Sequence, residues 1–126
     1  MDLFSIYKNE KELMMLETDL LKRFKKKLDV RVPSAKFYYK IPDTRELGGK
    51  KPFDSFLVVR GMFFAIEAKV KDRKVTPYQK YNLELVAASG GLPIELTEKN
   101  IDAVIELIQK AVRIKQLSTE IAKQTK

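Results

Sequence analysis

The chain has 126 residues, of which 44% are hydrophobic and 33% are charged, and its 25 Lys and Arg against 17 Asp and Glu give a net charge of +8. It contains neither cysteine nor histidine, which excludes disulfides, thiol chemistry, the usual zinc sites and every mechanism that needs a histidine base. Any metal must therefore be held by oxygen ligands, which favours Mg²⁺ or Mn²⁺.

The length suits a single domain over residues 1–126 with one modest core. The basic excess points to a polyanionic partner, nucleic acid before membrane, although a generally solvated basic surface is the alternative. No apolar run is long enough to span a membrane and the N-terminus lacks the apolar core of a signal peptide, so we expect a cytoplasmic protein.

A first helix is predicted over about residues 8–28, where leucines and Phe24 recur at helical spacing. Glu17 falls in the middle of this apolar stripe, where a carboxylate is costly unless it is paired or bound to a cation. Glu10 lies on the same face nearer the start of the helix, and Glu12 falls off the stripe. The alternative for Glu17 is an ion pair with a lysine at the edge of the core.

Two short strands, at 30–32 and 36–41, are predicted next. A polar, glycine-rich loop over 42–51 follows and ends in Lys50 and Lys51. A basic loop that leads into a carboxylate cluster is a place where a phosphate backbone could approach. A disordered surface connection is an equally good interpretation of this loop.

Residues 52–69, PFDSFLVVRGMFFAIEAK, predict a central β-hairpin. If Arg60 and Gly61 form a two-residue turn, Val59 faces Met62, and counting back sets Asp54 directly opposite Glu67. Like charges so placed destabilise a sheet unless something positive lies between them, and a metal ion is the obvious choice. The alternative is that both carboxylates are solvated charges at the strand ends.

The rest of the chain predicts a basic turn over 70–74, a helix from Thr76 and Pro77 to about Ser89, a short buried strand at 92–96 and a last helix over about 100–121. Tyr81, Leu85 and Ala88 are expected on the apolar face of the first of these helices. The order of elements predicts an α/β sandwich around a small mixed sheet. A stripe of Ile114, Leu117 and Ile121 extends the last helix, either to pack on a partner subunit or to fray.

These residues suit the hydrolysis of a phosphodiester. The reaction needs a nucleophilic water and compensation of charge at the phosphate, and a divalent ion held by carboxylates supplies both. Asp54 and Glu67 would hold the ion together with the backbone carbonyl of Ala68, and Lys69 points to the same face. Glu17 would complete the ligand shell or help to place a second ion.

The pattern Pro52-Phe53-Asp54 followed by Glu67-Ala68-Lys69 resembles the PD-(D/E)xK nuclease superfamily. The order of the first-helix glutamate, Lys-Pro-Phe-Asp, Glu-Ala-Lys, a basic turn and Thr-Pro-Tyr-Gln looks like its Holliday-junction-resolvase branch, which includes the virus-type VRR-NUC group. The resemblance covers roughly residues 10–97 and implies a restriction-endonuclease-like α/β/α sandwich with a catalytic core over about 30–97. Phe53 is a departure, because the virus-type group usually has Pro and Asp adjacent.

The resemblance implies a role for each matching residue. Asp54 and Glu67 would be metal ligands, Lys69 would position the attacking water, and Gln79 would assist near the lysine and the phosphate. The first-helix glutamate maps onto Glu17, with Glu10 and Glu12 as competitors. The residues expected to contact DNA are Lys36, Lys40, Lys50, Lys51, Lys71, Arg73, Lys74, Tyr78 and Lys80.

The expected function is that of a Mg²⁺-dependent (or Mn²⁺-dependent) DNA endonuclease that cleaves branched or structured DNA as a homodimer. A virus or a mobile element is one source that this function suggests. One alternative is a DNA-binding accessory protein that keeps the fold without catalysis. Another is a structural or adaptor subunit that uses its C-terminal helix.

Overall fold

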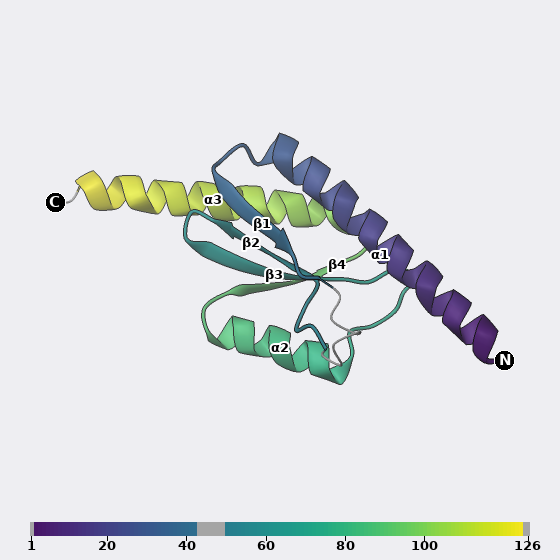
Figure 1. Cartoon of the computed structure of the whole chain (residues 1–126). Helices are drawn as coiled ribbons and strands as arrows, with labels where there is room; N and C mark the ends of the chain where they lie inside the picture. The colour runs from purple at the N-terminus through teal and green to yellow at the C-terminus, as the bar shows by residue number, and fades with distance from the viewer. Residues whose placement is uncertain (1, 43–49, 125–126) are drawn as a thin grey trace.

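A computed structural model describes residues 2–42 and 50–124 and contains three helices and four strands in these ranges. The elements are α1 (Leu3–Arg31), β1 (Lys36–Lys40), β2 (Ser55–Val59), β3 (Met62–Ala68), α2 (Pro77–Ala88), β4 (Leu92–Leu96) and α3 (Ile101–Gln124). Helices α1 and α3 cover one face of the sheet and α2 lies against the other (Figure 1). The predicted α/β/α sandwich is therefore confirmed.

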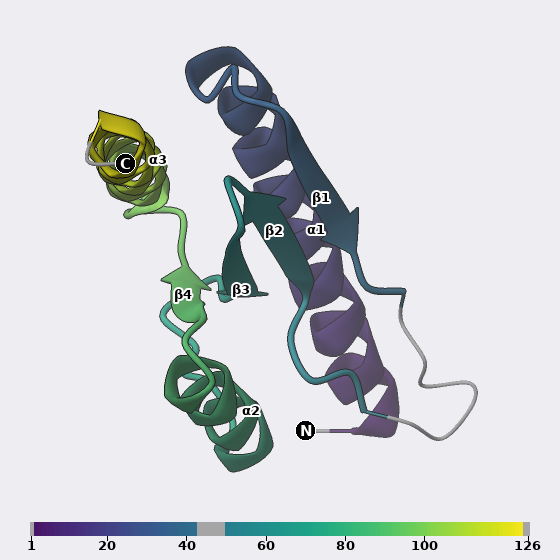
Figure 2. The same cartoon turned by 90° about the vertical axis from the view of Figure 1, so that its left-hand side faces the viewer.

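The four strands form one mixed sheet in the order β1-β2-β3-β4. β1, β2 and β3 are antiparallel neighbours, whereas β4 pairs parallel to β3 after the crossover through α2. β1 and β4 are the edge strands, and Figure 2 shows β1 lying along α1 at one edge. The hairpin β2–β3 is therefore the centre of the sheet, as predicted.

The turn between β2 and β3 has the register that the sequence predicts. Val59 pairs with Met62, and Arg60 and Gly61 have φ angles of 51° and 76°. A two-residue turn with both residues in the left-handed region is the type whose twist matches that of the flanking strands. Continued beyond Ser55 and Ile66, this register sets Asp54 opposite Glu67.

The core lies between the sheet and the helices α1 and α3. Alternation along the strands sends Leu57 and Val59 of β2 and Phe64 and Ile66 of β3 toward these helices. The predicted apolar stripe of the first helix meets them, because its central residues are fully buried; they are Leu20, Leu21, Phe24 and Leu28. Ile105 and Ile108 of α3 close the same core.

The predicted strand at 30–32 is wrong, because this segment completes α1. Helix α3 holds the last turn of α1 in place: the Gln109 side-chain amide donates to the Arg31 carbonyl at 2.9 Å, and the Arg31 guanidinium lies 3.4 Å from Asp102. At the other end the Asp2 side chain accepts from the Ser5 amide at 2.7 Å, which starts the helix five residues earlier than predicted.

The predicted apolar face of α2 is also wrong. Leu83 is the buried residue of this helix, whereas Tyr81 and Leu85 are 60% and 48% exposed. The capping box at the start of α2 turns Gln79 toward the sheet, and Leu83 lies one turn further along the same side. Only Ile94 and Leu96 of β4 are buried, so this strand is half-buried rather than buried. Helix α3 runs three residues further than predicted.

Within the described ranges, no helix has the length and apolar composition to cross a membrane. The glycine-rich part of the predicted loop, residues 43–49, lies outside the described residues.

Candidate active site

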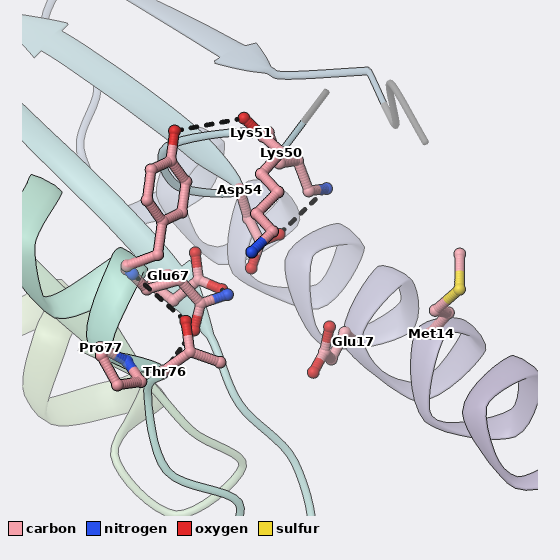
Figure 3. A pocket seen from close by; sticks show the side chains of 10 residues that line it. Met14, Glu17, Lys50, Lys51, Asp54, Glu67, Thr76 and Pro77 are labelled. Atoms are coloured by element: carbon pink, nitrogen blue, oxygen red, sulfur yellow. Dashed lines mark hydrogen bonds and ion pairs between the residues drawn. The ribbon is translucent and has the colours of Figure 1, made fainter. Parts of the chain in front are cut away.

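A cavity of about 570 Å³ opens at one end of the sheet, between α1 and α2 (Figure 3). Its lining comes from four separate segments of the chain and consists of Met14, Glu17, Lys50, Lys51, Asp54, Glu67, Thr76, Pro77, Tyr78 and Gln79. Six of these were predicted as metal ligands, as catalytic residues or as the loop lysines that lead to them. The fold therefore brings the predicted carboxylates into one cavity.

Asp54 is held from both sides. It is 4% exposed, and its Oδ2 accepts a hydrogen bond of 2.8 Å from the backbone amide of Ala68, on the strand opposite. Its Oδ1 lies 3.0 Å from the Nζ of Lys51. The backbone amide of Asp54 donates to the carbonyl of Ile66 at 3.0 Å, which continues the β2–β3 pairing past the end of β2. These contacts fix the carboxylate against the backbone of β3.

Glu67 is 2% exposed and has one satisfied and one unsatisfied oxygen. Its Oε1 accepts from the side-chain amide of Gln79 at 2.7 Å and lies 3.6 Å from the Nζ of Lys69. Its Oε2 is buried and has no hydrogen-bond partner among the described residues. A buried carboxylate oxygen without a donor is costly, so this atom calls for a cation or a proton.

The electrostatics of the pair favour a proton on Glu67 when no cation is present. Burial, followed by the negative charge of Asp54, raises the pKa of Glu67 to about 8, against the opposing effect of Lys69. The charge of Glu17 raises this pKa further. Two carboxylates that share a site behave in this way, since both cannot ionise without compensation.

Lys69 lies beyond the end of β3 and is 7% exposed. Its backbone amide donates to the carbonyl of Leu96 at 2.8 Å, which keeps the residue in the sheet after the last pair of β3 and β4. A lysine is rarely this buried unless it is paired, and here its ammonium lies beside Glu67. The prediction that Glu67 and Lys69 lie on the same face of the sheet agrees with this contact between their side chains.

Gln79 has two functions in the structure. Its backbone amide donates to Thr76 Oγ1 at 3.2 Å and its Oε1 accepts from the Thr76 amide at 2.9 Å, which together form a capping box at the start of α2. The remaining donor, Nε2, reaches Glu67. Because the cap uses the Oε1 of Gln79, the Nε2 is the atom of the side-chain amide that faces the carboxylate of Glu67.

Glu17 lines the cavity from α1, across from Thr76 and Pro77 (Figure 3). Burial, with a contribution from Asp54, raises the pKa of Glu17, so its carboxyl group lies in the field of the pair. In the described ranges, however, no three Asp, Glu, His or Cys side chains form a ligand group for a metal. Glu10 and Glu12 are exposed and do not line the cavity.

The basic residues predicted to contact DNA fall into two groups. Lys50 and Tyr78 meet at the cavity, where the Lys50 ammonium lies 5.7 Å from the centre of the Tyr78 ring and the Tyr78 hydroxyl donates to the Lys50 carbonyl at 3.4 Å. By contrast, the Nζ of Lys36 donates to the Val32 carbonyl at 2.7 Å and that of Lys40 lies 3.4 Å from Thr18 Oγ1, so both point toward α1.

The basic turn after β3 is exposed and its backbone is unusual. Lys71 and Asp72 have φ angles of 52° and 59°, in the left-handed region that favours glycine. The turn carries Lys71, Arg73 and Lys74, all exposed, while Lys80 is exposed on α2. Lys71 and Arg73 line a second, smaller cavity of about 120 Å³ together with Lys69, so the turn reaches the lysine next to Glu67.

Sequence reasoning missed three features of the cavity. No sequence pattern predicts the ion pair of Lys51 with Asp54, because the segment between them is neither helix nor strand. The capping box does have a sequence pattern, since Thr76 and Gln79 stand three residues apart as T-x-x-Q. Met14 precedes Glu17 by three residues and therefore lies on the same side of α1, a spacing that could have placed it in the cavity wall.

No family model matches the chain, and no curated protein matches it. Among solved structures, one described as a VRR_NUC domain is similar, with a TM-score of 0.55 and 20% sequence identity. The alignment covers 71% of this chain and 94% of that one. At this level of identity, the feature that the two chains share is the fold.

Proposed function

We propose that the chain acts as a single metal-dependent DNA endonuclease domain whose active site is the cavity around Asp54 and Glu67. The observation that carries this proposal is the pair of buried, opposed carboxylates, with Lys69 and Gln79 both directed at Glu67. Ordinary sheet packing has no use for two like charges facing each other in a buried position. The nuclease-like fold supports the same interpretation.

The donor set fits Mg²⁺ or Mn²⁺. Mg²⁺ is usually bound by one or two carboxylates and keeps several waters, so a pair of carboxylates is sufficient. The buried Oε2 of Glu67 has no other partner in the described residues, and Asp54 directly opposes it. Asp54, Glu67 and the carbonyl of Ala68 would hold the ion, and Glu17, which lines the same cavity, would complete the site or help to place a second ion.

When bound, a divalent ion lowers the pKa of a water and compensates charge at the phosphate. The chain's own groups prepare the site for this. Gln79 holds Glu67 in one orientation, the Ala68 amide does the same for Asp54, and the ammonium of Lys69 is positioned to orient the attacking water and to stabilise charge at the phosphate. Lys51 pairs with Asp54 and lies where a phosphate oxygen would arrive.

The proposed substrate is DNA, and we extend the proposal to branched or structured DNA cut by a homodimer. A chain with a net charge of +8 is attracted to a polyanion. Lys50 lines the cavity, and the exposed cations nearby in the sequence are Lys71, Arg73 and Lys74 of the turn after β3 and Lys80 of α2. Lys36 and Lys40, which bond toward α1, are the weakest of the predicted DNA contacts. Binding should weaken steeply as salt rises, since it is built on phosphate contacts.

The test is a cleavage panel of labelled junction, flap, single-stranded and duplex DNA with Mg²⁺, with Mn²⁺ and with a chelator. The expected result is cleavage by the wild-type chain that the chelator and Asp54→Asn both abolish, while DNA binding is retained. Glu84→Gln, which makes the equivalent change at an exposed carboxylate of α2, should cleave normally.

The same panel decides between this proposal and its alternative. A chain that binds DNA in a salt-dependent manner and cuts no substrate with either metal would be the non-catalytic accessory protein. Cleavage that survives in both Asp54→Asn and Glu67→Gln would show that the reaction does not use this cavity.

A further inference from the structure

A continuous row of aromatic rings lies on the sheet face that carries the two carboxylates. The register places Phe56 and Phe63 on the same face as Asp54 and Glu67, further along the same strands. Ring centres are 5.3 Å apart for Phe56 and Phe63, 5.7 Å for Phe56 and Tyr39, 6.3 Å for Tyr39 and Phe37, and 6.2 Å for Phe63 and Phe53. We call Phe37, Tyr39, Phe53, Phe56 and Phe63 the aromatic row.

Helix α2 covers only part of this face. It packs against β4 and β3, which leaves the rings of β1 and β2 without a helix over them in the described residues. Phe37 is 57% exposed and Tyr39 is 44% exposed. Between α2 and the row runs a groove of about 360 Å³, lined by Phe53, Phe63, Asn82, Leu85, Val86, Ser89 and Gly91. Large exposed apolar patches of this kind mark interaction sites.

The chemistry of the patch points to a protein rather than a nucleic acid. No lysine, arginine or acidic residue belongs to the aromatic row or lines the groove, although a third of the chain is charged. A surface that binds a nucleic acid strand combines its aromatic rings with cations along the backbone, and no cation lines this groove among the described residues. The centre of a protein interface is rich in aromatic residues and poor in charge.

We propose that a second copy of this chain docks on the aromatic row and the groove beside it. Two chains of net charge +8 repel each other wherever their lysines meet, so contact between copies is least costly on a neutral face. A two-fold contact places the same patch on both copies. The exposed parts of Phe37, Tyr39 and Leu85 would contribute to the roughly 800 Å² per partner of a stable interface.

This inference rests on the proposed function in one respect, because it names the surface of the proposed homodimer. It also places the interface elsewhere than on the stripe of Ile114, Leu117 and Ile121, which the sequence pattern offered as a surface for a partner subunit. The Asp54–Glu67 pair lies two residues along the strands from Phe56 and Ala65, roughly 7 Å. A contact through the row would therefore set each catalytic cavity beside the partner subunit.

The test is sedimentation velocity of the metal-free chain between about 1 and 100 µM. We expect a dimer in the wild type and a shift to monomer, by at least about tenfold in dissociation constant, in Phe37→Glu and in Tyr39→Glu. Both side chains are about half exposed, so circular dichroism should report an intact fold. Leu117→Glu, at a 50% exposed position on α3, is the matched control and should leave the dimer unchanged.

Two results would overturn the inference. A dimer that Leu117→Glu dissociates and Phe37→Glu does not would place the interface on α3. A monomeric wild type would also overturn it, and if Phe37→Glu then weakened binding of a single-stranded oligonucleotide, the face would be a nucleic acid surface. Asp54→Asn separates the two proposals, because it should abolish cleavage and leave the dimer intact, whereas a monomer that cleaves refutes only the interface.

Discussion

The two faces of the same four strands are built for different purposes. Toward α1 and α3, the central hairpin presents Leu57, Val59, Phe64 and Ile66, all buried among other apolar side chains. Toward α2, neighbouring positions on the same two strands present a pair of buried carboxylates and then the half-buried rings of Phe56 and Phe63. Successive side chains along a strand point to opposite faces of the sheet, and this alternation separates the apolar residues from the carboxylates and aromatic rings.

The two faces of the sheet contribute differently to the stability of the folded chain. Each apolar side chain buried on the α1/α3 face contributes about 1.5–3 kcal/mol. On the α2 face, Glu67 is buried beside another carboxylate and keeps an oxygen without a partner in the described residues, which lowers the stability of the folded state. A side chain kept in such a position without benefit to folding points to a role in binding or catalysis.

The largest expected effect is the loss of cleavage in Glu67→Gln. The amide keeps the size of the side chain but removes the negative charge, so we expect cleavage to fall about a thousandfold or more while DNA binding is retained. Cleavage assays with saturating Mg²⁺ measure this, with Glu84→Gln as the control. Less than a tenfold loss would mean that the α2 face is not the catalytic face.

On the other face, Phe64→Ala should unfold the protein more easily. Phe64 is fully buried three residues before Glu67 on the same strand, and deletion of a buried phenyl ring costs about 3–5 kcal/mol. The midpoint of urea unfolding measures the loss. Under conditions where the variant is fully folded, cleavage per folded molecule should stay within a few fold of wild type, and its complete loss would contradict the separation of the two faces.

Stability of the metal-free protein should depend on pH through Glu67. The pKa of Glu67 is raised from 4.5 to about 8 on folding, so between these values the folded state binds more protons than the unfolded state. Stability therefore falls as pH rises through this window. Glu67→Gln has no such proton to lose, so between pH 5 and pH 8 its free energy of unfolding should rise relative to that of wild type. At pH 8 the variant should be the more stable protein. A flat difference would show that Glu67 ionises normally.

The smallest of these effects concerns the cap that positions Gln79. Thr76→Ala removes the hydroxyl of the capping box, and loss of an N-cap costs about 1 kcal/mol. Thermal unfolding should detect it, together with a partial loss of cleavage, because Gln79 is no longer held. Thr119→Ala, at an exposed threonine inside α3 whose hydroxyl donates to the Lys115 carbonyl one turn earlier, should change neither quantity. If Thr76→Ala and Thr119→Ala changed thermal stability and cleavage equally, the capping box would have no specific role in positioning Gln79.

Local signals made much of this structure predictable. The apolar runs on either side of Arg60 and Gly61 set the hairpin and its register, and that register alone set Asp54 opposite Glu67. Thr76 and Pro77 marked the start of α2 correctly. In each case the residues that determine the feature are neighbours in the sequence or share one strand pair.

The features that were predicted wrongly depend on contacts between distant segments. Residues 30–32 have strand-like composition, but Val30 and Arg31 are helical and Val32 caps the helix, because α3 bonds to the end of α1 through Gln109. The buried face of α2 follows from the reach of Gln79 to Glu67, which the spacing of Tyr81 and Leu85 does not reveal. The ion pair of Lys51 with Asp54 likewise requires the folded path of the chain.

Calorimetric titration with Mn²⁺ tests the central claim most directly, because it measures the metal site without requiring the substrate to be known. The account predicts that the wild-type chain binds Mn²⁺ and releases protons at neutral pH, since Glu67 must lose its proton to bind. Lys69→Ala should bind Mn²⁺ as the wild type does and lose cleavage, whereas Glu67→Gln should lose binding. Binding of Mn²⁺ by Glu67→Gln with wild-type affinity and proton release would contradict the account.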